Sequence, residues 1–320
     1  MDRTTRRDFA VGLAAARPGF EPGYLRLERS GELEKRTKEL KEIYRNCRLC
    51  PRRCGVNRLK GETGVCRSTA RVKVASAHPH HGEERPISGR RGSGTVFFSN
   101  CNLLCLYCQN WEISHRGDGS WASDEEVGRM FTGLQGLGCH NINLVTPTHV
   151  VPNIVSALRW AAARGLRVPL VYNCGGYEPV EILKLLDGIV DIYLPDFKYM
   201  DGAVAGRLSG GASDYPEVAA AAIQEMQRQV GVLKLDESGV AQRGLLIRHL
   251  VLPRNLAGTD RFVKWVAGTL GKATWVNIMP QYRPEHRARE HEELSRRITG
   301  AEWRQALEWA REAGLTHVLT

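Results

Sequence analysis

The stretch Ser99-Asn-Cys-Asn-Leu-Leu-Cys-Leu-Tyr-Cys-Gln-Asn110 places Cys101, Cys105 and Cys108 on one short segment with the spacing C-x3-C-x2-C. Three thiolates so close in sequence can hold three irons of a cubane cluster and leave the fourth iron open to bind and activate a substrate. The run 94–99 before them is typical of a β-strand, so we expect the cysteines on the loop that leaves it, where α/β folds place their chemistry. The polar residues of the loop argue against three cysteines that merely fill a core.

Beyond this loop the sequence alternates between apolar strands and amphipathic helices. Strands are predicted at 94–99, 141–146, 168–173, 189–195, 245–252 and 274–279, and helices near 123–136, 151–164, 178–187, 215–230, 258–270 and 300–313. Such alternation indicates a parallel sheet that is buried on both faces. Six units predict an α/β fold, a partial (β/α)6 barrel of the TIM type, with its active groups at the C-terminal ends of the strands.

A second group of cysteines precedes this core: Cys47, Cys50, Cys54 and Cys66. Four soft ligands without an open position fit either a structural Zn²⁺ or a closed iron–sulfur cluster, and the spacing does not separate the two. Seven of the nine cysteines fall in the two groups, which indicates metal ligation in a reducing compartment rather than disulfides. We therefore predict a helix and a cysteine-rich metal-binding module at 29–92, ahead of the core and C-terminal helix at 93–320.

Residues 1–28 are predicted to form a disordered leader. Within it, Thr5-Arg-Arg-Asp-Phe-Ala-Val11 resembles a twin-arginine export signal. The apolar stretch that such a signal needs is marginal here and stops at Arg17-Pro18. A cytoplasmic location is therefore expected, with export as the alternative.

The net charge of +10 is concentrated at one end of the chain. Residues 1–92 carry 22 Lys and Arg against 11 Asp and Glu, a balance of +11, whereas the remaining residues carry 23 against 24, a balance of −1. No nucleic-acid-binding module is recognisable, so a nucleic acid is not an expected partner. No apolar run reaches the roughly 18 residues of a membrane span.

Several further motifs accompany the three-cysteine loop between about residues 72 and 283. They are Ile87-Ser-Gly, Gly92-Ser-Gly-Thr-Val-Phe-Phe98, Cys108-Gln-Asn, Asn143-Leu-Val-Thr-Pro-Thr-His149, Tyr172-Asn173, Gly188-Ile-Val-Asp-Ile-Tyr-Leu-Pro-Asp-Phe-Lys198, Arg248-His-Leu-Val-Leu-Pro253 and Met279-Pro-Gln-Tyr282. With the cysteine loop they resemble the radical S-adenosylmethionine (SAM) superfamily and, more narrowly, the uncharacterised relatives of pyruvate formate-lyase activating enzyme. The resemblance implies a barrel of the radical SAM type, here with an N-terminal cysteine-rich extension.

The resemblance also implies a reaction. Cys101, Cys105 and Cys108 would hold a [4Fe-4S] cluster, and SAM would chelate its open iron. An electron from a donor of the flavodoxin or ferredoxin type would cleave SAM to methionine and a 5′-deoxyadenosyl radical, which abstracts hydrogen from a substrate. A glycyl-radical partner protein is the family analogy, and a small molecule or a peptide is the alternative. Tyr107 is expected to pack near the adenine.

One departure from the superfamily concerns the end of the second strand, where Gly-Gly-Glu commonly binds the SAM ammonium. Here the sequence is Thr146-Pro-Thr-His149. Thr146, Thr148 and His149 offer acceptors for the ammonium, although Thr148 could instead cap the following helix. Asn173 is a candidate for ribose or carboxylate contacts, or a turn-stabilising residue. Asp196 and Lys198 are candidates for ordering SAM or substrate, or an ordinary ion pair.

Two questions stay open at this level. Arg248 and His249 lie inside an apolar strand and read either as inward-facing polar groups or, for the histidine, as a satisfied core residue. A protein of another class, a two-cluster electron-transfer or metal-binding protein without SAM cleavage, would use the same cysteines. The motifs at the later strand ends favour the enzyme, because an electron carrier does not need a whole barrel.

Overall fold

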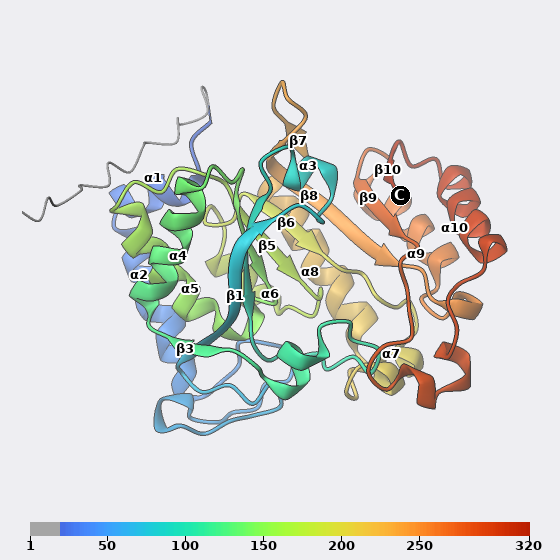
Figure 1. Cartoon of the computed structure of the whole chain (residues 1–320), viewed down its shortest axis with the longest axis horizontal. Coiled ribbons are helices and arrows are strands. Elements are labelled where there is room, and N and C mark those ends of the chain that lie inside the picture. Colours follow the sequence, from blue (N-terminus) through green and yellow to red (C-terminus); the bar gives the residue numbers. More distant parts are fainter. Residues whose placement is uncertain (1–19) are drawn as a thin grey trace, which may run out of the picture.

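The computed structural model describes residues 20–320, so the run that resembles an export signal lies outside the described residues. Its centre is a sheet in which six parallel strands stand side by side in chain order (Figure 1). These are β2 (Ser93–Phe98), β4 (Ile142–Val145), β5 (Leu170–Cys174), β6 (Ile192–Pro195), β8 (Ala241–Leu250) and β9 (Trp275–Met279). The predicted α/β fold with a central parallel sheet is confirmed.

Four shorter or antiparallel strands complete the sheet. β10 (His317–Leu319) extends it beside β9, while β1 (Val72–His80) pairs antiparallel with β2, and β3 (Ser120–Ala122) with β1. β7 (Lys234–Leu235) forms a hairpin with β8. The order of paired strands runs from β10 to β3, so the sheet of the described residues is open.

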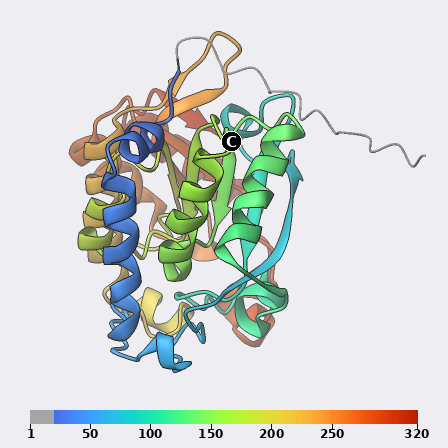
Figure 2. The same ribbon diagram turned by 90° about the vertical axis from the view of Figure 1, so that its left-hand side faces the viewer.

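Helices follow most of the parallel strands. Three α-helices of the described residues precede β2: α1 (Gly23–Arg29), α2 (Glu32–Glu42) and α3 (Arg85–Ser88). The α-helices after β2 are α4 (Asp124–Gly136), α5 (Val151–Ala162), α6 (Val180–Leu185), α7 (Gly202–Leu208), α8 (Tyr215–Val230), α9 (Thr259–Trp265) and α10 (Gly300–Glu312). α4 and α10 each begin with a capping box, Ser123 with Glu126 and Thr299 with Glu302, which satisfies backbone N–H groups at the helix start. In Figure 2, α1, α2, α4 and α5 stack beside one another outside the sheet. No helix between residues 20 and 320 is long and apolar enough to cross a membrane.

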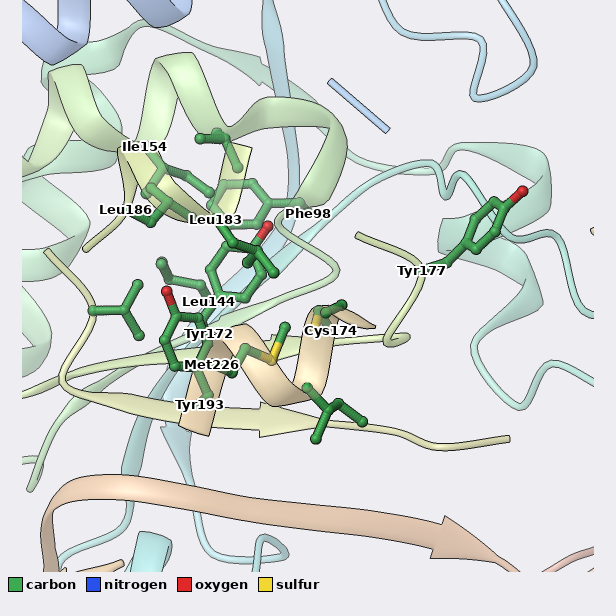
Figure 3. Packing of buried hydrophobic residues seen from close by; sticks show 14 of the residues in the cluster. Phe98, Leu144, Ile154, Tyr172, Cys174, Tyr177, Leu183, Leu186, Tyr193 and Met226 are labelled. Atoms are coloured by element: carbon green, nitrogen blue, oxygen red, sulfur yellow. The ribbon is translucent and has the colours of Figure 1, made fainter. Parts of the chain in front are cut away.

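The two faces of the sheet follow from the alternation of side chains along each strand. On one face, Tyr172 and Tyr193 pack with Leu183 of α6 and Met226 of α8 (Figure 3). On the other face, a separate apolar cluster contains Ile87 of α3 together with strand residues Val171, Ile192, Leu194 and Leu246. Asn173, Asp196 and Arg248 continue this second series toward the C-terminal strand ends, and therefore belong to the inner face.

The predicted disordered leader is wrong for residues 20–28. Tyr24 of α1 is fully buried and donates its hydroxyl to Val168 O at 2.9 Å. Gly23 N donates to Asp191 Oδ1 at 3.0 Å, and a Cβ at Gly23 would come within 2.4 Å of Gly188 O. Pro22 stands at the N-cap of α1, so a helix begins inside the segment that is predicted to be disordered.

Residues 29–92 share their core with the rest of the chain. Leu40, Leu49 and Val72 belong to the same apolar cluster as Val96 and Phe98 of β2. The predicted boundary at 92/93 also falls immediately before β2, whose antiparallel partner β1 lies on the other side of that boundary. The packing therefore shows no break at this point.

Candidate functional site

Cys101, Cys105 and Cys108 line one cavity of about 260 Å³, on the loop that leaves β2. The loop turns through left-handed backbone at Asn100, with φ of 74°, and at Leu104, with φ of 55°. Polar residues from the ends of later strands complete the lining: Thr146, Asn173, Asp196, Lys198, Arg248 and Gln281. The structure thus brings the predicted cysteines together with most of the predicted polar residues.

Each of the three sulfurs has a hydrogen-bonding neighbour. Leu103 N donates to Cys101 Sγ at 3.3 Å, Ser209 Oγ donates to Cys105 Sγ at 3.1 Å, and Ser114 Oγ lies 3.1 Å from Cys108 Sγ. Hydrogen bonds to ligand sulfurs tune iron–sulfur clusters. Sequence reasoning missed both serines, and Ser209 is 104 residues from its cysteine, so no local pattern could have found it.

Burial dominates the protonation of these thiols. It raises the pKa of Cys101 to about 12, and it also raises the pKa of Cys105. A buried thiolate is costly, so the Cys101 and Cys105 thiols keep their protons at neutral pH when no metal is bound, although Lys198 partly opposes the shift at Cys105. A metal that binds here must displace them, after which the neighbouring donors stabilise the thiolates.

A buried ion pair network lies across the cavity from the cysteines. Asp196 accepts from Lys198 Nζ at 2.6 Å and from Arg248 Nε at 2.9 Å. Burial alone would raise the pKa of Asp196, but Arg248 and Lys198 outweigh it and hold this pKa below its ordinary value. Arg248 Nη2 also donates to Asn173 Oδ1 at 2.6 Å. Asp196 and Lys198 therefore form an ion pair and line the cavity as well.

Two glutamates reach the interior of the sheet below this network. Asn173 Nδ2 donates to Glu83 Oε1 at 3.2 Å and Arg248 Nη1 to Glu83 Oε2 at 3.4 Å, while Asn277 Nδ2 donates to Glu84 Oε1 at 2.8 Å. Burial raises the pKa of Glu83 to about 7, against the opposing effect of Arg248. The two carboxylates therefore have polar partners from three strands, β5, β8 and β9. Their segment enters the inner face ahead of α3.

Tyr107 and Thr146 both line the cavity. The Tyr107 ring is 5% exposed and packs edge-on against Tyr199 and Tyr282, and the Tyr199 hydroxyl donates to the Tyr107 hydroxyl at 2.6 Å. Thr146 has a φ of 59°, a left-handed conformation that is costly for a β-branched residue and occurs mostly at functional sites. The strand end is therefore held in a strained shape where it meets the cavity.

Thr148 and His149, predicted beside Thr146, point to other partners. The Thr148 hydroxyl donates to Glu178 Oε1, and it forms no side-chain cap on the helix that follows. His149 is buried, and it lines a second, smaller cavity. Burial lowers the pKa of His149 to about 4, and Arg58 adds to this effect. His249 is a core histidine, since Nδ1 lies 2.7 Å from Phe197 O and Nε2 lies 2.9 Å from Thr259 Oγ1.

The second cavity, of about 10 Å³, is where the other four cysteines converge. It is lined by Cys47, Cys50, Cys54 and Cys66, with Leu49, Val56, Arg58, Gly64 and His149. Gly64 is required by space, because a Cβ at this position would lie 2.5 Å from Cys54 Sγ. The neighbouring Val65 N donates to Cys54 Sγ at 3.4 Å. The segment 47–66 therefore wraps its four sulfurs around one small space.

The spacing of these side chains bears on the kind of metal. In residues 20–320, no three His, Cys, Asp or Glu side chains are gathered as ligands of a single ion. Around one zinc, thiolates at about 2.3 Å from the metal would lie about 4 Å from one another. In a cluster each thiolate binds a different iron, so the sulfurs stand further apart. A cluster therefore requires a less close gathering of the sulfurs than a single zinc ion does.

The two cysteine groups are in direct structural contact. Arg52 Nε donates to Asn102 O at 3.0 Å, and Arg52 Nη2 donates to Ser209 O at 3.1 Å. Arg58 Nη1 donates to His149 O at 2.7 Å, and His149 Nε2 lies 2.8 Å from Ser99 O. The cysteine-rich segment is thus fastened to the three-cysteine loop and to the end of β4.

No protein-family model matches the chain. Among solved structures, it is similar to a radical SAM methyltransferase from Sphaerobacter thermophilus (14% identity, 71% of this chain and 65% of that chain, TM-score 0.49). It is also similar to HydG, a maturase of the [FeFe]-hydrogenase (12%, 68% and 48%, TM-score 0.47), and to methylornithine synthase PylB (13%, 94% and 83%, TM-score 0.43). The chain spans less than two thirds of the methyltransferase and about half of HydG. With TM-scores below 0.5, these likenesses carry no functional argument.

A curated protein gives a closer match along most of the chain. The uncharacterized protein MJ0674 of Methanocaldococcus jannaschii is 32% identical over 285 residues, which cover 86% of this chain and 77% of the relative. The alignment therefore includes most of the structure described above. On this similarity, the chain belongs to the same family as MJ0674.

Proposed function

We propose that the chain is a radical SAM enzyme, built on a partial (β/α)6 barrel, in which Cys101, Cys105 and Cys108 hold a [4Fe-4S] cluster. The observation that carries the proposal is that the three thiols line one cavity with polar groups from successive strand ends. Three ligands on a cubane leave one iron open, and a cavity of about 260 Å³ beside it offers space for part of a cofactor of the size of SAM. Bound there, the cluster and SAM supply one-electron cleavage to methionine and a 5′-deoxyadenosyl radical, which abstracts hydrogen from a substrate.

A fourth cysteine, Cys174, also lines the cavity. Cys174 lies at the end of β5, and burial raises the pKa of its thiol well above the ordinary value. Cys174 shares the helix-covered face of the sheet with Tyr172. We therefore propose that Cys101, Cys105 and Cys108, and not Cys174, bind the cluster. This set fits the three-thiolate ligation that leaves an iron open.

The other cavity residues would bind and orient SAM. Lys198 and Arg248 supply positive charge for its carboxylate, and Asp196, which is held ionised between them, supplies an acceptor for its ammonium. Thr146 and Asn173 supply further hydrogen-bonding groups at neighbouring strand ends. Tyr107, in its aromatic cluster, offers a flat apolar wall for the adenine.

Water must be kept from a reactive radical, and the cavity lining is suited to this task. Leu103, Ile113, Val145, Leu250 and Met279 contribute apolar surface between the cysteines and the polar strand ends. The Glu83 segment closes the inner face beneath Arg248 and Asn173. Substrate and SAM would therefore share a space sheltered from bulk solvent.

The remaining parts of the proposal concern partners and the second site. Cys47, Cys50, Cys54 and Cys66 would hold a second metal centre, an auxiliary iron–sulfur cluster, with zinc as the alternative. A flavodoxin- or ferredoxin-type donor in a reducing cytoplasm would supply the electron. The proposed substrate is a protein that receives a glycyl radical, as in pyruvate formate-lyase activation, with a small molecule or a peptide as the alternative.

The test is reductive cleavage of SAM. The holoprotein, reconstituted anaerobically with iron and sulfide, is reduced with dithionite in the presence of SAM, and 5′-deoxyadenosine is quantified by chromatography. We expect its formation in the wild type and in Cys174→Ala, and its loss in Cys105→Ala. A reducible cluster that never yields 5′-deoxyadenosine would overturn the proposal in favour of an electron-transfer protein.

A further inference from the structure

His149 is a buried histidine with one ring nitrogen that lacks a partner. The residue is 1% exposed, and Nε2 lies 2.8 Å from Ser99 O. A carbonyl oxygen can only accept, so Nε2 carries the proton and Nδ1 presents a lone pair. Nδ1 has no hydrogen-bond partner in the described structure. A buried polar atom without a partner is costly, so it points to a group that completes the site.

The surroundings of the ring narrow down what that group is. His149 lines the small cavity together with Cys47, Cys50, Cys54 and Cys66. Thiolate sulfurs are acceptors, as the free nitrogen is, so cysteines that have lost their protons to a metal cannot satisfy Nδ1. A metal can. A ring nitrogen that donates to a backbone carbonyl while the other binds metal is also the usual arrangement of ligating histidines.

We propose that His149 binds, through Nδ1, an iron–sulfur cluster held in this cavity by the neighbouring cysteines. The inference rests on the proposed second metal centre and deepens it. A cluster of this kind takes four protein ligands, so His149 and three of the four cysteines would suffice. Histidine in place of a thiolate raises the reduction potential of a cluster, because a neutral ligand replaces an anionic one.

The position of His149 also gives this centre a connection to the radical site. Its Nε2–H donates to the carbonyl of Ser99, two residues before Cys101. One imidazole ring thus stands between the second cavity and the loop that carries the first cluster. A redox-active centre here is suited to exchanging electrons with its neighbour, which a zinc ion cannot do.

The experiment isolates the second centre in the full-length chain. In Cys101→Ala/Cys105→Ala/Cys108→Ala, reconstitution with iron and sulfide should still give bound iron. Pulsed EPR of the reduced cluster should detect a directly coordinated nitrogen. This nitrogen coupling should vanish in His149→Ala, whereas His149→Cys should keep the iron without the coupling. His249→Ala is the matched control, because it removes a buried histidine whose two nitrogens both have partners.

Several outcomes would overturn the inference. These are the absence of nitrogen coupling in the parent triple variant, its persistence in His149→Ala, or uptake of zinc without iron. Single Cys→Ala changes in the second group provide another test: one of the four should retain the cluster, and loss of iron in all four would leave no position for His149. If the triple variant does not fold by circular dichroism, the nitrogen coupling is compared between wild type and His149→Ala.

The result is independent of SAM cleavage, because the triple variant lacks the ligands of the proposed SAM site. A nitrogen-ligated cluster in a protein that never cleaves SAM would contradict the proposed enzyme and leave this inference standing. SAM cleavage by a His149→Ala protein with an unchanged second cluster would support the proposed enzyme and contradict this inference.

Discussion

Glu178 provides a quantitative test of the packing around the strand ends. Its side chain is buried, and Oε1 accepts from the Thr148 hydroxyl while Oε2 accepts from the Tyr172 hydroxyl at 3.0 Å. Burial raises the pKa of Glu178 from its ordinary value of 4.5 to about 8, although these hydrogen bonds oppose the shift. The folded protein therefore keeps this carboxyl protonated at neutral pH.

Because of this pKa shift, the free energy of unfolding should fall as the pH rises. Between about pH 4.5 and 8 the unfolded chain ionises Glu178 and the folded chain does not, so unfolding releases a proton. The contribution of Glu178 to stability is complete below pH 4.5 and is lost as the pH rises through 8. One pKa unit is worth about 1.4 kcal/mol, so from pH 5 to pH 8 the loss is about 4 kcal/mol. With an unfolding entropy of about 0.6 kcal/mol/K for 300 residues, this corresponds to roughly 6 °C in melting temperature.

The assay compares Glu178→Gln with the wild type by thermal unfolding from pH 5 to pH 9 at constant ionic strength. A glutamine imitates the neutral acid but cannot ionise, so the melting temperature of the variant should gain about 6 °C on the wild type between pH 5 and 8, and level off above. A mismatched amide adds an offset that does not vary with pH. Glu181→Gln, at an exposed carboxylate of the same segment, sets the baseline. A difference that stays constant across this range would refute the buried, protonated carboxyl.

Three further changes test the two cysteine sites and the helices. Ser209→Ala removes a hydrogen bond to Cys105 Sγ, so the reduction potential of the three-cysteine cluster should fall in a redox titration. The fall should be roughly 40 mV for a hydrogen bond worth about 1 kcal/mol. An unchanged potential would exclude this hydrogen bond. Gly64→Ala places a methyl group 2.5 Å from Cys54 Sγ, so iron bound at the second site should drop, and full occupancy would contradict the tight fit. Gly133→Ala, in open space on α4, should raise the stability to denaturant by up to about 1 kcal/mol without changing bound iron; a loss of stability would mean that the position is not open.

The fold was predictable because apolar strands and amphipathic helices alternate along the chain and are separated by recognisable turn and loop residues. The elements that escaped prediction are those with too little local signal. His317–Leu319 becomes β10 only because β9 offers an unpaired edge, and three residues are too few to show an alternation. Tyr24 is anchored by Val168, a partner far along the chain, so its segment reads as a leader in the sequence.

The candidate site also contains some residues that the sequence predicts and others that only the structure shows. The cysteines, Asn173, Asp196 and Lys198 are recognisable because strand ends gather in a parallel sheet, whatever the details of packing. Glu83 looks like one of several polar loop residues, and only the path of its segment into the sheet makes it a partner of Arg248. His149 follows Thr146 by three residues, but a turn that begins in left-handed backbone at Thr146 places the two residues at different cavities. Spacing along the chain cannot reveal such a turn.

The contact between His149 and the four-cysteine cavity has a consequence for the order of assembly during synthesis. Cys66 leaves the ribosome 83 residues ahead of His149, since 149 minus 66 is 83. Until β4 has emerged and settled beside β2, the early segment has sulfurs but lacks both the ring and the carbonyl that anchors Arg58. A metal captured by the nascent chain would therefore meet a different set of ligands from the one in the finished protein. Correct loading of the second cavity is expected to follow folding of the sheet, so the cysteine-rich segment expressed alone should bind a different metal or none.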